Sequence, residues 1–442
     1  MPLTRADLLR LIKALEEEGT PVNKIAAKAR VSPEQLQSWL EEDSPPEKLE
    51  RALISICEKD SRFRLLHSYG LATPTFNRYS RFSFDDNPIG YNWHAPLPPL
   101  PEMPQKLLDF KVDFPFGVPA CILTYGHRAI KMYAGLGFDI LTYKTVRTLP
   151  HKGHPWTSIN PNWAYVTQLP SKFSPPFEEP VVADKEAWPE SIENVTMVNS
   201  FGIPSMNPDQ WKDDIEKAKK AVRRGHQVLI VSVVASPDLS TTMTQDEIVQ
   251  GFVNAGKAAK EAGADIVEVN YSCPNTPKGP EIYRDPVMSA RISEAMHEAL
   301  KPTPVLMKIG YLRKEQLSDI VSANIKWIDG IVAINTISAP VNDSKGNQFF
   351  PGEGRQHAGV SGVAIKPWAM EVARNLADLR SQESWREKII LAVGGVTKPE
   401  DVREYLDIGV DGVLSCTGAY NNRYLAIETR RQLGKLAPTA SR

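Results

Sequence analysis

The stretch Ala264-Asp265-Ile266-Val267-Glu268-Val269-Asn270-Tyr271-Ser272-Cys273-Pro274-Asn275 decides the fold of this chain. Its first half is largely apolar, and prolines and Gly279 follow, so it predicts a buried strand that turns into a loop. Two carboxamides, a hydroxyl and a thiol gather at the carboxyl end of that strand. In a parallel α/β fold, ligands bind at this edge. A buried Cys beside turn-forming Asn residues gives the same pattern, so the other strand ends must be compared with it.

Strand and helix patterns alternate from about Phe110 onward. Strand-like apolar runs occur at Val118–Leu123, Phe138–Thr145, Gln227–Val234, Asp265–Tyr271, Pro304–Ile309, Gly330–Asn335, Lys388–Val393 and Gly412–Cys416. Amphipathic helix patterns include Asp209–Arg224, Gln245–Ala262, Pro286–Ala299, Lys366–Leu379, Pro399–Asp407 and Asn421–Gly434. Eight strands with interleaved helices predict the α/β class and a (β/α)8 TIM barrel over residues 107–442.

A long segment interrupts this alternation at about residues 147–197, after the second predicted strand. It contains many Pro, His and Trp residues, whereas a connection within a barrel usually takes only a few residues. We predict that it forms a lid or an interface element over the ligand face.

Residues 1–60 have the pattern of an all-helical module. The run Ile25–Leu40 resembles a bacterial helix-turn-helix, with Ser32 as N-cap and Pro33 at the first helical position. DNA binding requires a cationic surface, but this segment carries nine Lys and Arg against twelve Asp and Glu, a net charge of −3. We therefore favour a partner-binding or oligomerisation module over DNA binding.

Residues 61–106 are rich in Pro and aromatic side chains. This composition predicts an extended connecting segment laid over a surface.

Composition bounds the class of protein. The chain has 442 residues, 42% hydrophobic and 24% charged, with a net charge of −1, so it gives no reason to expect a nucleic-acid or membrane partner. No apolar window reaches the length of a membrane span. The four cysteines lie far apart in the sequence: Cys57, Cys121, Cys273 and Cys416. This spacing argues against a metal site, an iron–sulfur cluster or a disulfide framework, and it favours a cytoplasmic protein.

Two lysines stand inside apolar strand patterns near their carboxyl ends, Lys144 and Lys308. Burying a lysine is costly unless an anion meets it. Either one alone could extend to the surface, but two at ligand-facing ends predict an anionic ligand. Asn residues also recur at strand ends, as turn formers or, taken together, as donors and acceptors suited to a cyclic imide or ureide.

The last two predicted strands end in small residues. Gly394-Gly395 follows one strand and Cys416-Thr417-Gly418 follows the next, which matches the usual position of a phosphate site in such barrels. The chain has no Gly-x-Gly-x-x-Gly after a strand, so a Rossmann domain is not indicated.

With these motifs in view, residues 107–435 resemble the flavin domain of dihydroorotate dehydrogenases, with the barrel of dihydropyrimidine dehydrogenase as a close relative. The motif Asn-x-Ser-Cys-Pro-Asn at 270–275 is specific to this group. The resemblance implies FMN as cofactor and Cys273 as the catalytic base of the soluble class, where the membrane-associated class has Ser.

The resemblance also implies site residues. Catalytic roles fall to Cys273, Lys144 and Lys308. Contacts with FMN fall to Ala120, Cys121, Lys144, Thr145, Asn270, Lys308, Asn335, Ser361, Gly362, Gly394, Gly395, Cys416 and Thr417. Contacts with substrate fall to Lys144, Asn199, Gly202, Ile203, Asn270, Asn275, Asn335 and Thr336. The implied reaction, a step of pyrimidine biosynthesis, oxidises dihydroorotate to orotate. Cys273 takes the C5 proton while a hydride passes from C6 to flavin N5, and Lys308 stabilises the anionic reduced flavin.

Two departures from the family pattern keep alternatives open. Phe201 stands where uracil-type enzymes have glutamate, which disfavours uracil, whereas Cys416 replaces a usual Gly and is more typical of the pyrimidine-reducing branch. A flavin reductase of another small unsaturated ring is therefore the second hypothesis. A ligand-sensing regulator with an N-terminal DNA- or partner-binding module is the third. A separate reductase subunit, fumarate, a quinone and oxygen all remain open as electron acceptor, and the resemblance is compatible with a homodimer.

Overall fold

The chain divides into two compact units, Met1–Pro74 and Thr75–Arg442. The computed structural model describes residues 9, 12, 13, 15, 16, 20–41, 49, 52, 53, 100–149, 162–185, 187, 189, 191–235, 243–271, 282–381 and 385–434. Among these residues, no helix is both long enough and apolar enough to cross a membrane.

Two helices of the first unit are described, α2 (Val22–Ala29) and α3 (Pro33–Glu41). Arg30 ends α2 in the left-handed region at φ 58°, and the N–H of Gln35 donates to Ser32 Oγ at 3.2 Å, so Ser32 caps α3 as the sequence predicts. Most of the residues of the two flanking predicted helices lie outside the described part of the chain. A helix-turn-helix domain over residues 1–60 therefore stays a prediction, as does the connecting segment at 61–106.

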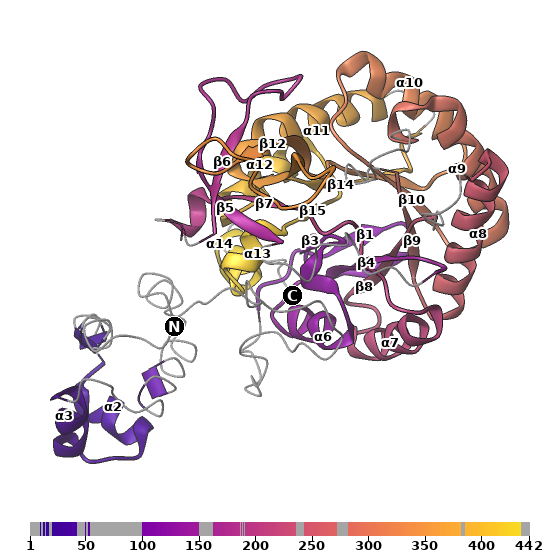
Figure 1. Cartoon of the computed structure of the whole chain (residues 1–442). Helices are drawn as coiled ribbons and strands as arrows, with labels where there is room; N and C mark the ends of the chain where they lie inside the picture. Colours follow the sequence, from indigo (N-terminus) through magenta and orange to yellow (C-terminus); the bar gives the residue numbers. More distant parts are fainter. Residues whose placement is uncertain are drawn as a thin grey trace. The chain divides into compact units, whose positions relative to one another are not determined.

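The second unit is built on a closed barrel of eight parallel strands in the order β10-β11-β14-β15-β3-β4-β8-β9 (Figure 1). Their bounds are β3 Phe116–Val118, β4 Ile140–Val146, β8 Val228–Val233, β9 Ile266–Asn270, β10 Val305–Ile309, β11 Gly330–Ala333, β14 Ile389–Val393 and β15 Gly412–Leu414. Helices surround the barrel: α6 His127–Gly135, α7 Pro208–Ala221, α8 Gln245–Glu261, α9 Pro286–Leu300, α10 Lys314–Asn324, α11 Lys366–Arg380, α12 Pro399–Ile408, α13 Thr417–Asn421 and α14 Leu425–Gly434. The predicted TIM barrel is confirmed.

Two boundaries predicted from the sequence were wrong. The run Val118–Leu123 is not one strand, because β3 ends at Val118 and a 3-10 turn follows at Ile122–Thr124. The pattern Asn421–Gly434 is not one helix, because α13 ends at Asn421 and α14 begins at Leu425. In both places the apolar pattern continues through a turn, so periodicity alone could not locate the break.

A second, smaller sheet lies beside the barrel. It closes in the order β12-β13-β7-β5-β6, with β5 Trp163–Gln168, β6 Val181–Asp184, β7 Thr196–Asn199, β12 Ile337–Asn342 and β13 His357–Gly362. The segment at 147–197 thus supplies β5, β6 and the start of β7. β6 and β7 pair with β12 and β13, which come more than a hundred residues later. The predicted lid or interface role of this segment stays a prediction.

The amino-terminal end of the barrel is plugged by a hairpin of β1 (Gln105–Leu107) and β2 (Phe110–Val112). Leu107 and Val112 are fully buried and join the apolar side chains that fill the barrel, among them Ile140, Ile266 and Leu306. This end is closed by hydrophobic packing, which leaves the carboxyl ends of the strands as the face available to a ligand.

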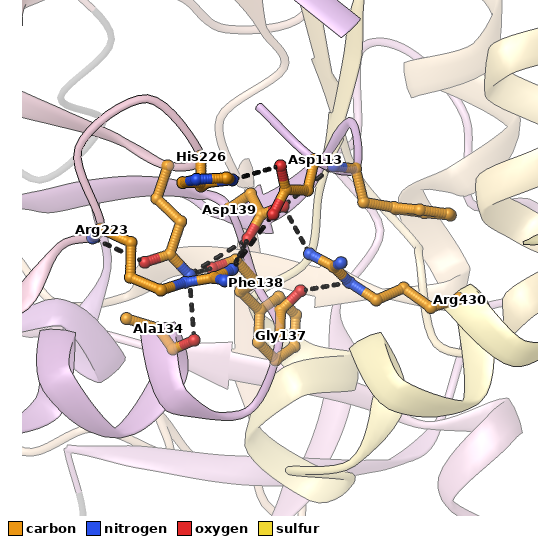
Figure 2. A network of polar contacts seen from close by, with 10 residues as sticks. Asp113, Ala134, Gly137, Phe138, Asp139, Arg223, His226 and Arg430 are labelled. Atoms are coloured by element: carbon orange, nitrogen blue, oxygen red, sulfur yellow. Dashed lines mark hydrogen bonds and ion pairs between the residues drawn. The ribbon is translucent and has the colours of Figure 1, made fainter. Parts of the chain in front are cut away.

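A network of polar contacts also lies at the amino-terminal ends of β4 and β8 (Figure 2). Asp139 is fully buried, accepts hydrogen bonds from the N–H of Phe114 at 2.9 Å and from Gln227 Nε2 at 3.0 Å, and forms an ion pair with Arg430. Arg430, on α14, is itself 2% exposed and donates from Nε to the carbonyl oxygen of Gly137 at 2.8 Å. The network joins the last helix to the base of the barrel.

Replacing Arg430 by Met should lower the free energy of unfolding by about 3–5 kcal/mol, because it leaves the Asp139 carboxylate buried without its cation. Arg223→Met is the matched control, since Arg223 is half exposed and its Nη2 lies 3.5 Å from Asp139 Oδ1. This control should cost only about 0–1 kcal/mol. Urea unfolding of both variants measures the difference, and equal losses would contradict the assigned role of the buried pair.

Candidate active site

Three neighbouring strands of the barrel are joined by hydrogen bonds at their carboxyl ends. Thr145, on β4, shares a hydrogen bond of 3.0 Å with Ser232 Oγ on β8, and Asn270 Nδ2, on β9, donates to Thr145 Oγ1 at 3.2 Å. Lys144 precedes Thr145 and is 8% exposed. These contacts bring the predicted residues of β4 and β9 together at the barrel mouth.

Lys308 reaches across the mouth from β10. Its ammonium is 3% exposed and donates from Nζ to the carbonyl oxygen of Ala120 at 3.4 Å. Ala120 follows β3, which stands opposite β10 in the eight-stranded order. No carboxylate lies within ion-pair distance of Lys308 in the described part of the chain. An ammonium has three donors, so at most one is used here, and a ligand acceptor would offset the cost of burial.

Two thiols meet where β15 lies beside β3. The thiols of Cys121 and Cys416 interact, and neither is part of a disulfide. Burial alone would raise the pKa of Cys121, but the Cys416 thiol, the backbone N–H of Leu123 and the charges of Lys308 and Lys144 together lower it. The interaction with Cys121 and burial raise the pKa of Cys416. Both thiols therefore lie in the electric field of the two lysines.

The residues predicted to hold the phosphate, Gly394, Gly395, Cys416 and Thr417, lie after β14 and at the start of α13. Ser361 and Gly362, predicted as further FMN contacts, end β13. The hydroxyl of Thr417 donates to Ser361 Oγ at 2.9 Å. Gly362 and Gly395 have φ of 88° and 69°, and an added Cβ would lie 2.2 Å from the carbonyl oxygen of Val195 and 2.3 Å from Lys366 Cβ respectively. Only glycine fits at these two positions.

The remaining predicted substrate residues lie on loops above the barrel. Asn199 Nδ2 donates to the carbonyl oxygen of Gly359 at 3.3 Å, and the N–H of Asn335 donates to the carbonyl oxygen of Ile309 at 2.9 Å. Thr336 packs against Gly359, whose added Cβ would lie 2.4 Å from Thr336 Oγ1.

The loop after β7 contains two predicted substrate contacts, Gly202 and Ile203. Both are buried and left-handed, at φ of 72° and 51°. No acceptor for either backbone N–H lies within hydrogen-bond distance among the described residues. Because buried backbone donors are almost always paired, these two N–H groups can serve an anion.

Two predicted residues of the central motif, Cys273 and Asn275, lie outside the described residues, in the gap at 272–281. The structure therefore places the first residue of the motif, Asn270, at the barrel mouth but gives no contacts for the thiol of Cys273.

Reasoning from the sequence missed four polar residues near the site. Ser232 carries the one hydroxyl of the apolar strand β8. The criterion that identified Lys144, a polar residue inside an apolar strand pattern, would also have identified Ser232. Glu268 is fully buried on the face of β9 that also carries Asn270, and neither carboxyl oxygen has a hydrogen-bond partner among the described residues. Arg147 and Arg355 are also buried, but they stand in polar stretches of sequence that give no signal of it.

Known proteins resemble this chain over much of its length. The family model for dihydroorotate dehydrogenase matches residues 186–436. Dihydroorotate dehydrogenase of Dictyostelium discoideum is 31% identical over 337 residues, 74% of this chain and 87% of that protein. The catalytic subunit of dihydroorotate dehydrogenase B (NAD(+)) from Thermoplasma acidophilum is 29% identical over 228 residues, 51% of this chain and 67% of that protein. The PreA subunit of NAD-dependent dihydropyrimidine dehydrogenase from Escherichia coli is 26% identical over 197 residues, 43% of this chain and 46% of that protein.

The fold, the strand-end residues and these matches define a flavin-dependent dehydrogenase that acts on CH–CH bonds. The chain belongs to the dihydroorotate dehydrogenase family, whose members depend on FMN.

Replacing Gly395 by Ala should abolish retention of FMN, because the new Cβ cannot fit against Lys366 without moving the turn after β14. Gly409→Ala is the matched control: Gly409 is also left-handed, at φ 96°, but an added Cβ meets nothing within 4 Å. The control should lose only about 1–2 kcal/mol of stability through strain. Flavin absorbance per purified chain measures retention. A Gly395→Ala protein that keeps one FMN per chain would contradict the prediction.

Proposed function

We propose that this enzyme oxidises dihydroorotate, or a close analogue that carries a carboxylate, to the unsaturated ring with FMN as cofactor and Cys273 as base. The observation that carries the proposal is the set of unsatisfied donors at the barrel mouth. The buried ammonium of Lys308 and the N–H groups of Gly202 and Ile203 have few or no acceptors among the described residues. A ring with carbonyl groups and a carboxylate supplies acceptors for such donors.

The residues present fit FMN. The left-handed turns at Gly362 and Gly394–Gly395 pack closely against Val195, Ala369 and Lys366, which fixes the direction of their backbone N–H groups, and the hydroxyls of Ser361 and Thr417 are hydrogen-bonded to each other nearby. The ring would lie between Lys308, Ala120 and Cys121, where the Lys308 ammonium can interact with its pyrimidine edge. When bound, FMN supplies the acceptor for a hydride.

The chain's own residues would then position substrate and move one proton. Asn270 is held by Thr145 and Ser232, which fixes its carboxamide at the end of β9 for a hydrogen bond to the substrate ring. Lys144, on the neighbouring β4, and the loop at Gly202–Ile203 would bind the carboxylate. Cys273, three residues after Asn270, would accept the C5 proton.

A second candidate is the reduction of another pyrimidine ring. Cys416, in contact with Cys121 near the expected ring position, is more typical of that branch, and the E. coli PreA relative is a subunit of a dihydropyrimidine dehydrogenase. Phe201 favours the first candidate, because uracil-type members have glutamate there.

We also propose two kinds of partner, one that accepts electrons from the enzyme and one that binds the first unit. The T. acidophilum relative is a catalytic subunit of an NAD(+)-linked enzyme, and we propose a separate electron-transfer partner for this chain too. For residues 1–60 we propose partner binding or self-association, because their net charge is negative and α3 carries no Lys or Arg.

Anaerobic mixing of the purified protein with dihydroorotate should bleach the visible flavin absorbance within one turnover, because the ring and carboxylate both match the donors at the mouth. Dihydrouracil and dihydrothymine, which lack the carboxylate, should bleach it much more slowly. Bleaching by dihydrouracil alone would overturn the choice of substrate and favour the second candidate.

Replacing Cys273 by Ala should slow flavin reduction by roughly 10²–10⁴-fold and leave FMN bound, because only the proton acceptor is lost. Cys273→Ser, which places the residue of the membrane-associated class there, should keep part of the rate. Cys57→Ala, which removes a thiol of the first unit, is the control and should retain the full rate. Stopped-flow absorbance gives the rates, and an unchanged rate in Cys273→Ala would mean that another group is the base.

A further inference from the structure

A buried arginine without a counter-ion lies behind the loop at Gly202–Ile203. Arg355 stands in the connection between β12 and β13, is fully buried, and has no carboxylate within ion-pair distance among the described residues. Burial lowers the pKa of its guanidinium to about 10, so the group is still charged at neutral pH. A lone buried cation is costly, so a purely structural role would be served better by an apolar side chain.

Among the described residues, the guanidinium of Arg355 donates to backbone and hydroxyl oxygens. Nη2 donates to the carbonyl oxygen of Ser200 at 2.7 Å, Nε to Ser200 Oγ at 3.1 Å and Nη1 to the carbonyl oxygen of Pro351 at 3.2 Å. The fork of the guanidinium thus holds both polar oxygens of Ser200, which is 1% exposed.

Ser200 begins the strained part of the loop. Two residues later Gly202 and Ile203 are both left-handed, and that conformation is unfavourable for a β-branched residue such as Ile. Such strain persists only where the surrounding contacts determine the backbone. Here it sets the direction of the two N–H groups that lack an acceptor.

A second buried arginine holds the other end of the loop. Arg147, three residues after Lys144, donates from Nε to the carbonyl oxygen of Ile203 at 3.0 Å, and its backbone N–H donates to Ser205 Oγ at 3.0 Å. The segment Ser200–Ser205 is therefore held at Ser200 by the guanidinium of Arg355, and at Ile203 and Ser205 by the side chain and the backbone N–H of Arg147. It is tied to the strand that carries Lys144.

We propose that Arg355 is a positioning residue that holds the loop at Ser200–Ser205 in its anion-binding shape and thereby makes the enzyme selective for substrates with a carboxylate. The inference rests on the proposed function. Arg355 acts in two ways. Its Nη2 and Nε groups hold Ser200 by hydrogen bonds. Its uncompensated charge adds to the positive potential in a low-dielectric region where screening is weak.

Hydrogen exchange tests the positioning role without any substrate. The N–H of Ser200 donates to the carbonyl oxygen of Asn162 at 2.9 Å, so its exchange reports the order of the loop. In FMN-loaded Arg355→Met this amide should exchange roughly tenfold faster than in the wild type. An unchanged rate in a folded variant would overturn the positioning role, whatever the substrate is.

Ligand binding tests the selectivity. Orotate and uracil, which is the same ring without the carboxylate, are titrated against the oxidised flavin absorbance. Arg355→Met should weaken orotate binding roughly ten- to a hundredfold, as expected for loss of hydrogen bonds from a charged group, and change uracil binding less than about twofold. Equal weakening of both ligands, or unchanged orotate binding, would overturn the proposal.

Three further variants distinguish a loss of folding from a loss of carboxylate selectivity. Arg355→Lys keeps the charge but not the fork and should fall between wild type and Arg355→Met. Ser200→Ala, which removes only one acceptor, should do the same and serves if Arg355→Met does not fold. Arg430→Lys alters a buried arginine at the other end of the barrel and should leave the orotate-to-uracil ratio unchanged. If wild-type protein binds no orotate, the proposed function and the selectivity fail, whereas the exchange of Ser200 still decides the positioning role.

Discussion

The buried ammonium of Lys308 is the constraint on which the rest of the barrel mouth depends. It crosses to the carbonyl oxygen of Ala120 and meets no carboxylate among the described residues. A charge in such a place is costly unless a ligand with negative charge meets it. The charge of Lys308 also acts on the thiols of Cys121 and Cys416. We propose that these groups and the hydroxyls of Ser361 and Thr417 face the bound flavin.

The two ends of the barrel carry different kinds of interaction. At the amino-terminal end, the β1–β2 hairpin closes the core, and the polar groups around Asp139 are paired with one another. At the carboxyl end, the N–H groups of Gly202 and Ile203 have no acceptor among the described residues, and their loop is strained. Stability is thus concentrated at one end, and the unsatisfied polarity required for binding at the other.

The barrel could be predicted from the sequence because each of its strands is a short apolar run followed by an amphipathic helix. The second sheet could not, because β6 and β7 find their partners β12 and β13 far along the chain, and single strands of it carry no distinctive pattern. The burial of polar residues could be predicted where such a residue interrupts an apolar strand, as at Lys144, Lys308 and Asn270. The burial of Arg355 could not be predicted, because it depends on a fold that brings its loop against Ser200.

The most direct measurement is titration of the apoprotein with FMN, and with riboflavin for comparison, followed by flavin fluorescence and calorimetry. One FMN should bind per chain, and riboflavin should bind much more weakly, because it lacks the phosphate that the turn at Gly394–Gly395 and the hydroxyls of Ser361 and Thr417 would hold. A folded protein that takes up neither flavin would contradict the account of the barrel mouth.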